Sequence, residues 1–218
     1  MASKKETVVK EAEENRITVA VSLRVDVIKS YGEVRDALDE NLFRWLTLAG
    51  CMPMPVPNTL IEENLLERWF EKVNPGAIVL SGGNNIGEIG NRDETELFLL
   101  EKAKSEKIPL LGICRGMQMI AVWAGEKLHP VEGHVGTRHQ LKSELVNKHL
   151  PESVNSYHDF GLLSVPDHFD IIARDEDGVI EALCHKELPI EGWMWHPERE
   201  QEFSTIDLEN FKRLINKQ

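Results

Sequence analysis

The chain has 218 residues, which fits one folded domain and is long enough to bury a sizeable core without a disulfide or a metal. Lys and Arg number 25 against 37 Asp and Glu, and the net charge of -12 excludes a protein that holds nucleic acid or an anionic membrane by bulk electrostatics. Three cysteines without a framework spacing predict reduced thiols in a cytoplasmic protein. Neither a signal peptide nor a membrane-spanning apolar run is found in the sequence.

The chain order predicts a polar N-terminal extension over residues 1–16, followed by one domain over residues 17–218. In the first half of this domain, short apolar runs alternate with amphipathic stretches. Strands are predicted at residues 17–23, 52–56, 77–80 and 109–113, and helices at 36–49, 61–72, 93–105 and 115–124. Prolines place the 52–56 strand near a sheet edge. This alternation implies right-handed βαβ units and a mostly parallel sheet.

The pattern changes after Gly125, where strands are predicted without helices between them. These strands cover residues 139–146, 169–174, 179–184 and 190–195. A last helix over residues 205–216 begins with Ser204 and Asp207 in the spacing of a capping box. The predicted class is α/β, with a mostly parallel sheet flanked by helices and antiparallel additions in the C-terminal half.

The most informative segment is Pro109–Gln118, where an apolar strand meets a helix at Cys114. Glycines lie two residues before and two after this cysteine, as in a strand–turn–helix nucleophile elbow with Cys in place of Ser. The helix N-terminus favours a thiolate, and the backbone N–H of Arg115 is positioned for an oxyanion. A buried structural cysteine is the competing interpretation, which the two glycines make less favourable. Cys51 and Cys184 lack such glycines and are interpreted as packing residues.

A thiolate nucleophile needs a base, and the base needs an orienting group. His196 follows an apolar strand near the C-terminus and can take and return the proton, while Glu198, two residues on, can fix its tautomer. The segment Ser81–Asn84 follows the strand that precedes the cysteine strand. Its glycine pair allows close backbone approach, and Gly83 is expected to supply a second oxyanion N–H.

Together these segments resemble the class I glutamine amidotransferase superfamily, and within it the γ-glutamyl hydrolase branch, peptidase family C26. The resemblance covers residues 17–218 and depends on four motifs: Ser81–Asn84, Gly112–Gln118, Val154–His158 and Trp195–Glu198. It implies a flavodoxin-like catalytic domain, a Cys114–His196–Glu198 triad and a γ-glutamyl thioester intermediate on the cysteine. Gln118 and the Ser156–Tyr157 backbone would hold the α-amino and α-carboxylate groups of the glutamyl moiety. The substrate-binding residues that it implies are Gln118, Asn84, Ser156, Tyr157 and His158.

Two further stretches, residues 35–58 and 82–96, are similar to a sub-branch found among sugar and capsule biosynthesis proteins. One activity of that sub-branch is hydrolysis of γ-glutamyl-CDP-amidate, although Asn85 stands where many members have Asp. The expected function is therefore cleavage of a small-molecule γ-glutamyl amide to L-glutamate and an amine or amidate. A glutaminase subunit that delivers ammonia to a partner synthase and a γ-glutamyl-GABA-type hydrolase stay open, as does a homodimer. A catalytically silent binding module is disfavoured by the complete triad.

Three histidines recur every five residues: His129, His134 and His139. This spacing gathers ligands on neither a helix face nor a strand face, so no metal site is expected. A polar loop at the pocket mouth is expected instead, where His134, Arg138 and His139 are candidates to contact the leaving group. Three arginines are candidate partners for a nucleotide phosphate, and solvated surface arginines are the competing interpretation for each: Arg24, Arg92 and Arg115. Neither a dinucleotide fingerprint nor a P-loop occurs in the sequence, and no cofactor is expected.

Overall fold

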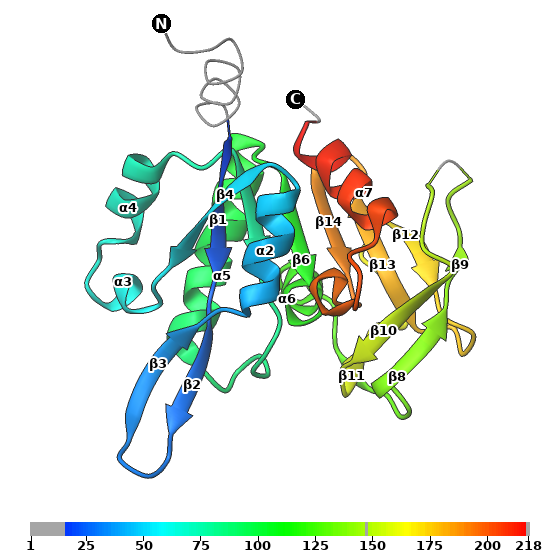
Figure 1. Cartoon of the computed structure of the whole chain (residues 1–218), viewed down its shortest axis with the longest axis horizontal. Helices are drawn as coiled ribbons and strands as arrows, with labels where there is room; N and C mark the ends of the chain where they lie inside the picture. Colours follow the sequence, from blue (N-terminus) through cyan, green and yellow to red (C-terminus); the bar gives the residue numbers. More distant parts are fainter. Residues whose placement is uncertain (1–15, 147, 217–218) are drawn as a thin grey trace, which may run out of the picture.

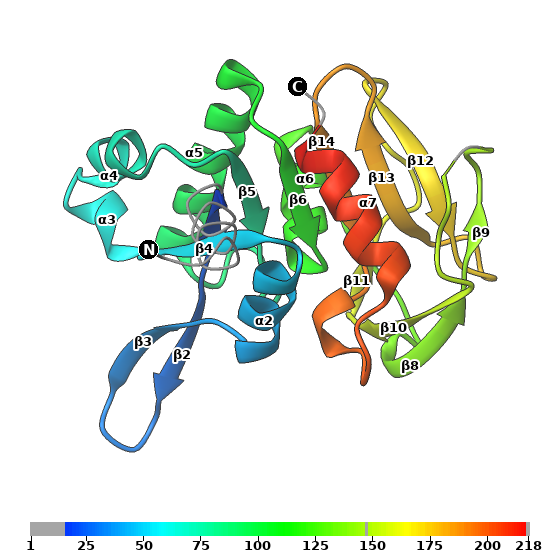
Figure 2. The same ribbon diagram turned by 45° about the horizontal axis from the view of Figure 1, so that its top comes forward.

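A computed structural model describes residues 16–146 and 148–216, so most of the expected extension over residues 1–16 lies outside the described residues. An eight-stranded sheet forms the centre of the molecule, with helices on both faces (Figures 1 and 2). From edge to edge, its strands are β4 (Cys51–Val56), β1 (Ile17–Ser22), β5 (Ala77–Leu80), β6 (Leu110–Ile113), β14 (Ile190–Trp193), β13 (Ile180–His185), β12 (Phe169–Arg174) and β9 (Lys142–Ser143).

The first five strands of this order are parallel to one another, and the last three continue the sheet in antiparallel fashion. The mixed α/β class with antiparallel C-terminal additions is therefore confirmed. The proline-containing β4 forms an edge of the sheet, as predicted. β14 differs from β13 and β12 in that it pairs in parallel with β6. The segment that follows β6 and the segment that follows β14 therefore meet at the same edge of the sheet.

Each face of the sheet has its own apolar core because successive strand residues point to opposite sides. In β5, Ala77 and Val79 join one cluster, and Ile78 and Leu80 join the other. The first cluster is completed by α2 (Glu40–Leu48) and α7 (Thr205–Ile215). The second is completed by α4 (Leu66–Val73), α5 (Gly90–Glu106) and α6 (Arg115–Trp123). No helix in the described part of the chain is long and apolar enough to cross a membrane.

An unpredicted hairpin of β2 (Arg24–Ile28) and β3 (Glu33–Ala37) follows directly after β1 and projects from the body of the molecule (Figure 1). The helix predicted over residues 36–49 is therefore shorter at its start. It begins after Asp39, whose carboxylate accepts a hydrogen bond from the Asn41 N–H and caps α2. Most of β3 is exposed, so it lacks the buried alternation by which a strand is recognised in a sequence.

The continuous helix predicted over residues 61–72 is wrong. The structure has two helices there, α3 (Thr59–Glu62) and α4, and the turn between them contains Asn64 at a φ of 53°. Asparagine is one of the few residues that adopt this left-handed conformation readily, so the chain turns where a helix would otherwise continue.

Two short ribbons lie next to the C-terminal half of the sheet (Figures 1 and 2). They pair β8 (Val135–Gln140) with β10 (Ser153–Tyr157), and β7 (His129–Pro130) with β11 (Phe160–Gly161). The strand predicted over residues 139–146 is thus divided between β8 and β9.

The β8–β10 ribbon contains a bulge. Thr137 pairs with Ser156 and Val135 pairs with Tyr157, so Gly136, at a φ of 69°, is one residue more than β10 can match. A glycine in the left-handed conformation is the usual residue at such a bulge. The extra residue reverses the inward and outward alternation of side chains in β8.

Candidate active site

Cys114 lies at the junction of β6 and α6, with backbone angles of φ 52° and ψ -105°. A residue with a Cβ is strained in this region, and such strain is common at catalytic turns. A Cβ on Gly112 would lie 2.5 Å from the backbone of Gly116, and a Cβ on Gly116 would lie 2.2 Å from the Leu80 carbonyl oxygen. The two glycines therefore let the turn and α6 pack directly against β5, as the elbow pattern predicts.

His196 follows β14 and is buried beside Cys114, which is one of the groups that act on its ring. Its Nδ1 lies 2.6 Å from Oε1 of Glu198, which is also buried, in the one-turn helix η1 (Pro197–Arg199). Burial lowers the pKa of His196, but the interactions of its ring with Cys114 and Glu198 outweigh burial and raise the pKa to about 9. An imidazolium is therefore favoured between the sulfur and the carboxylate at neutral pH.

Asn155 fixes the backbone of His196, a contact that sequence reasoning missed. Its Oδ1 accepts a hydrogen bond from the His196 N–H at 3.0 Å, and its Nδ2 donates to the His196 carbonyl oxygen at 2.8 Å. The same Nδ2 donates to Oε1 of Glu200 at 2.8 Å. Its position within the Val154–His158 motif is the signal in the sequence that points to it.

A buried arginine holds the loop after β5. Arg92, in α5, donates to the carbonyl oxygens of Ser81 at 2.8 Å, of Gly82 at 3.0 Å and also of Gly83. The described residues contain no cis peptide bond, and in a trans peptide the C=O of one residue and the N–H of the next point in opposite directions. The N–H of Gly83 is therefore turned away from the guanidinium. Burial lowers the pKa of Arg92 to about 10, which leaves it a cation at neutral pH.

The carboxylate of Glu96 is completely buried between Arg92 and Arg115. Arg115 forms a second ion pair with Asp93. These contacts correct the expectation that Arg92 and Arg115 bind a nucleotide phosphate, since the two side chains are 0% and 2% exposed and already paired. Arg24, with 43% of its side chain exposed, is the candidate whose side chain is not buried, and it lines a pocket.

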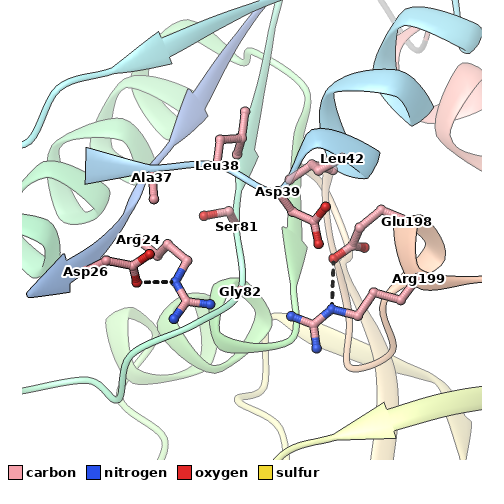
Figure 3. Close-up of a pocket in the computed structure, with 10 residues that line it drawn as sticks. All are labelled: Arg24, Asp26, Ala37, Leu38, Asp39, Leu42, Ser81, Gly82, Glu198 and Arg199. Carbon is pink, nitrogen blue, oxygen red and sulfur yellow. Dashed lines mark hydrogen bonds and ion pairs between the residues drawn. The ribbon is translucent and has the colours of Figure 1, made fainter. Parts of the chain in front are cut away.

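A pocket of about 240 Å³ opens at Cys114. Many of the predicted site residues meet there, since its lining includes Gly83, Asn84, Cys114, Arg115, Gln118, Tyr157 and His158. Tyr157 also lies edge-on to the His196 ring, with centroids 5.9 Å apart. A second pocket, of about 210 Å³, lies against the β2–β3 hairpin (Figure 3). It is lined by residues that include Arg24, Asp39, Gly82, Glu198 and Arg199.

Some of the predicted binding residues have other contacts. The side-chain amide of Asn84 accepts a hydrogen bond from the Val25 N–H at 2.8 Å and donates one to the Val25 carbonyl oxygen at 3.0 Å. These two bonds attach the loop after β5 to the β2–β3 hairpin. The Gln118 Nε2 donates to the Phe160 carbonyl oxygen at 2.8 Å. Ser156 is fully buried, and its hydroxyl donates to the His134 carbonyl oxygen at 2.6 Å.

The structure corrects the position expected for His134. This side chain is 2% exposed and packs against His139 and His158, with ring centroids 4.3 Å and 4.7 Å away, so it does not form part of a polar loop at the pocket mouth. The argument from five-residue spacing also fails. The bulge at Gly136 adds one residue between His134, which directly precedes β8, and His139 within it, and the two side chains consequently lie on the same side of the ribbon.

Fold and site together define an α/β protein with a cysteine elbow next to a histidine–carboxylate pair. The family model of the class I glutamine amidotransferases matches residues 33–211, and the chain belongs to this family. It is 36% identical over 141 residues to the gamma-glutamyl-CDP-amidate hydrolase of Campylobacter jejuni, a match that covers 61% of this chain and 66% of that protein, just under two thirds of it.

The chain is also 31% identical over 179 residues to the glutamine-hydrolyzing GMP synthase subunit of Pyrococcus abyssi, covering 79% of this chain and 90% of the relative. A solved structure from Thermoplasma acidophilum, assigned to the same kind of GMP synthase subunit, superposes with a TM-score of 0.71 at 22% identity and covers 92% of this chain and 94% of its own. This likeness concerns the fold. The family model and these relatives place the chain among the class I glutamine amidotransferases.

Proposed function

We propose that this chain is a dedicated hydrolase of γ-glutamyl-CDP-amidate that releases L-glutamate and a nucleotide-linked amidate for the decoration of capsular polysaccharide. The observation that carries the proposal is the strained Cys114 turn beside His196, which Glu198 orients, in a chain similar to the Campylobacter hydrolase. Covalent amide hydrolysis needs a nucleophile and a base that is oriented by a third group, and Cys114, His196 and Glu198 can take these three roles.

In the proposed reaction, the Cys114 sulfur attacks the γ-carbonyl carbon, and the oxyanion accepts hydrogen bonds from the N–H groups of Gly83 and Arg115. His196 donates its proton to the leaving nitrogen, the C–N bond breaks and a thioester remains on the sulfur. Water then attacks the thioester and gives a proton to His196, and the C–S bond breaks to release glutamate. Glu198 keeps the imidazole oriented through both steps.

The two pockets support a division of the substrate between a glutamyl half and a leaving group. The pocket at Cys114 is lined by Gln118 and Tyr157, which we assign to the glutamyl moiety. The pocket against the hairpin contains the guanidinium groups of Arg24 and Arg199 beside Gly82. In contrast to Arg92 and Arg115 these two side chains are partly exposed, and their carboxylate partners in the pocket are Asp26 at 3.0 Å and Glu198 at 3.8 Å (Figure 3). Arg199 also lies over the Tyr157 ring, 4.9 Å from its centroid, and so is held near the boundary between the pockets. A diphosphate is the kind of leaving group that paired guanidinium groups recognise.

The proposal is tested by glutamate release from four substrates: glutamine, γ-glutamyl-GABA, a folyl diglutamate and γ-glutamyl-CDP-amidate. We expect the CDP-amidate to be cleaved with the highest kcat/KM. Cys114→Ala should lose several powers of ten in that rate, while Cys184→Ala, a cysteine outside the pocket, should retain it. Strong turnover of another conjugate would overturn the substrate assignment. Wild-type glutamate release by Cys114→Ala would overturn the chemistry.

A glutaminase that supplies ammonia to a synthase is the second candidate, and the match to 90% of the glutamine-hydrolyzing GMP synthase subunit favours it. Such a subunit should be nearly idle on glutamine until its synthase is added. Silence on every conjugate in the panel, with glutamine turnover that rises on addition of a synthase, would establish this function in place of the first.

A further inference from the structure

Three histidines and a glutamate beside the catalytic site lie close enough to share one ion. One ligand atom from each of His134, His139, His158 and Glu181 lies within 4.8 Å of the other three. The histidines belong to the β8–β10 ribbon and its ends, whereas Glu181 is in β13 of the main sheet. We propose that these four residues bind one divalent transition-metal ion, with Zn²⁺ preferred, and that the ion fastens the ribbon to the sheet.

The atoms that would bind the ion are buried and form no hydrogen bonds with the described residues. Nδ1 of His134, Nε2 of His139, Nε2 of His158 and both carboxylate oxygens of Glu181 have no hydrogen-bond partner among the described residues. Three of the four residues are almost completely buried, and His139 is half-buried. Buried polar atoms are normally satisfied, so a group of them that converges on one point indicates a shared ligand.

The second nitrogen of two of these imidazoles already faces an acceptor. Nδ1 of His158 lies 3.0 Å from the Phe160 carbonyl oxygen, and Nε2 of His134 lies 3.4 Å from Oδ2 of Asp175. Oδ1 of the same aspartate accepts the Val179 N–H at 2.8 Å, which fixes the carboxylate. Contacts of this kind place the proton on the outer nitrogen and direct the lone pair of the inner nitrogen at a metal.

The separations suit a small ion with nitrogen ligands. Oε1 of Glu181 lies 3.5 Å from Nε2 of His158 and 3.7 Å from Nδ1 of His134. Tetrahedral zinc with ordinary bond lengths puts neighbouring ligand atoms about 3.4 Å apart, so shifts of about 1 Å would close the whole cluster around it. Imidazole nitrogens select Zn²⁺ and similar ions over Mg²⁺ and Ca²⁺, which prefer oxygen ligands. Four protein ligands leave no open position, as in structural zinc sites.

An ion here would also balance charge and support the catalytic histidine. The carboxylate of Glu181 is 0% exposed, and a buried carboxylate is costly unless a cation or hydrogen bonds compensate its charge. The ribbon that the ion would fix contains Asn155, whose amide holds the backbone of His196. Removal of the ion is therefore expected to loosen the ribbon and to disturb the position of the base.

The test uses the full chain without a histidine tag and with Cys114→Ser, so that the active-site thiol cannot bind the metal. The apoprotein, prepared with a chelator, is titrated with Zn²⁺, and bound metal is counted by mass spectrometry. Thermal unfolding is followed in parallel, and Co²⁺ is added as a probe whose visible spectrum reports tetrahedral coordination. The variants are His139→Ala and Glu181→Gln, and the matched control is His129→Ala, an exposed histidine of β7.

We expect one zinc per chain, a tetrahedral Co²⁺ spectrum and a rise in Tm of about 5–10 °C at 100 times the Kd. Both cluster variants should bind at least about tenfold more weakly, and His129→Ala should bind like the parent. If Glu181→Gln does not fold, the half-exposed position of His139 still allows the comparison. Failure of the apoprotein to bind zinc, or equal binding by His139→Ala and His129→Ala, would overturn the proposal.

Discussion

Replacing Gly82 with alanine should disturb catalysis without unfolding the protein. A Cβ at this position would lie 2.6 Å from Cε1 of His196 and 3.5 Å from both ring nitrogens. Carbon atoms in ordinary contact are about 3.5–4.0 Å apart, so the ring or the loop must move by about 1 Å. The ring has little freedom to retreat, because Glu198 holds its Nδ1 at 2.6 Å and Asn155 holds its backbone.

A displacement of about 1 Å in a catalytic group costs roughly 10²-fold in rate, which corresponds to about 2.7 kcal/mol in transition-state free energy. The effect on stability is smaller. Gly82 is not among the glycines with positive φ, so alanine fits its backbone and gains about 0.4–1 kcal/mol from a less flexible unfolded chain. The steric clash opposes this by about 1–3 kcal/mol, and the net change in Tm should stay below about 8 °C.

The assay compares glutamate release by Gly82→Ala with that by Gly90→Ala, a matched change at the first residue of α5, where an added Cβ meets open space. We expect kcat to fall in the first variant with KM nearly unchanged, and both constants to stay at wild-type values in the second. Thermal unfolding confirms that both proteins are folded. If folded Gly82→Ala keeps kcat within threefold of wild type, the assignment of His196 as the proton-transfer group is refuted.

Three further outcomes are expected. The pKa of His196 is raised to about 9 and the leaving group needs the proton of this residue, so kcat/KM should decrease as the pH rises through about 9. The stability that His196 contributes is complete below its ordinary pKa of 6.5 and should be lost as the pH rises to about 9. A decrease in kcat/KM centred near pH 6.5 would contradict the raised pKa. Glu96→Gln leaves the buried guanidinium of Arg92 without its carboxylate partner and Arg115 with Asp93 alone, and it should cost about 3–5 kcal/mol in urea unfolding. The exposed Glu94→Gln should cost almost nothing, and equal midpoints would disprove the reasoning. Iodoacetamide should modify Cys114 before Cys51, because burial raises the pKa of Cys51 to about 11; peptide mapping by mass spectrometry checks the order, and earlier modification of Cys51 would count against it.

The nucleophile turn was predictable because its causes are local in the sequence. Gly112 and Gly116 flank Cys114 at fixed spacing, and the apolar runs on either side of the motif identify a buried strand and a helix. The β2–β3 hairpin gave no comparable signal, because a strand exposed on most of its length carries no buried alternation.

The remaining contacts depend on residues that are far apart in sequence. Arg92 resembles any charged residue of a surface helix until the fold places it against three carbonyl groups. Glu181 reaches the histidines from a strand on the main sheet, and a single bulge at Gly136 reverses the face on which His139 lies. Spacing rules assume regular strands, and one inserted residue is enough to invalidate them.

The contacts of Arg92 orient the N–H of Gly83 in the folded protein, before any substrate reacts. Because its guanidinium already draws three consecutive carbonyl groups inward, the N–H of Gly83 faces the opposite way before any reaction begins. In water, the dipoles around a growing negative charge must rotate during every reaction event, and that rotation is part of the barrier. In the reaction proposed above, the equivalent alignment of the Gly83 N–H takes place once, when α5 folds against the sheet, and it is not repeated from one turnover to the next.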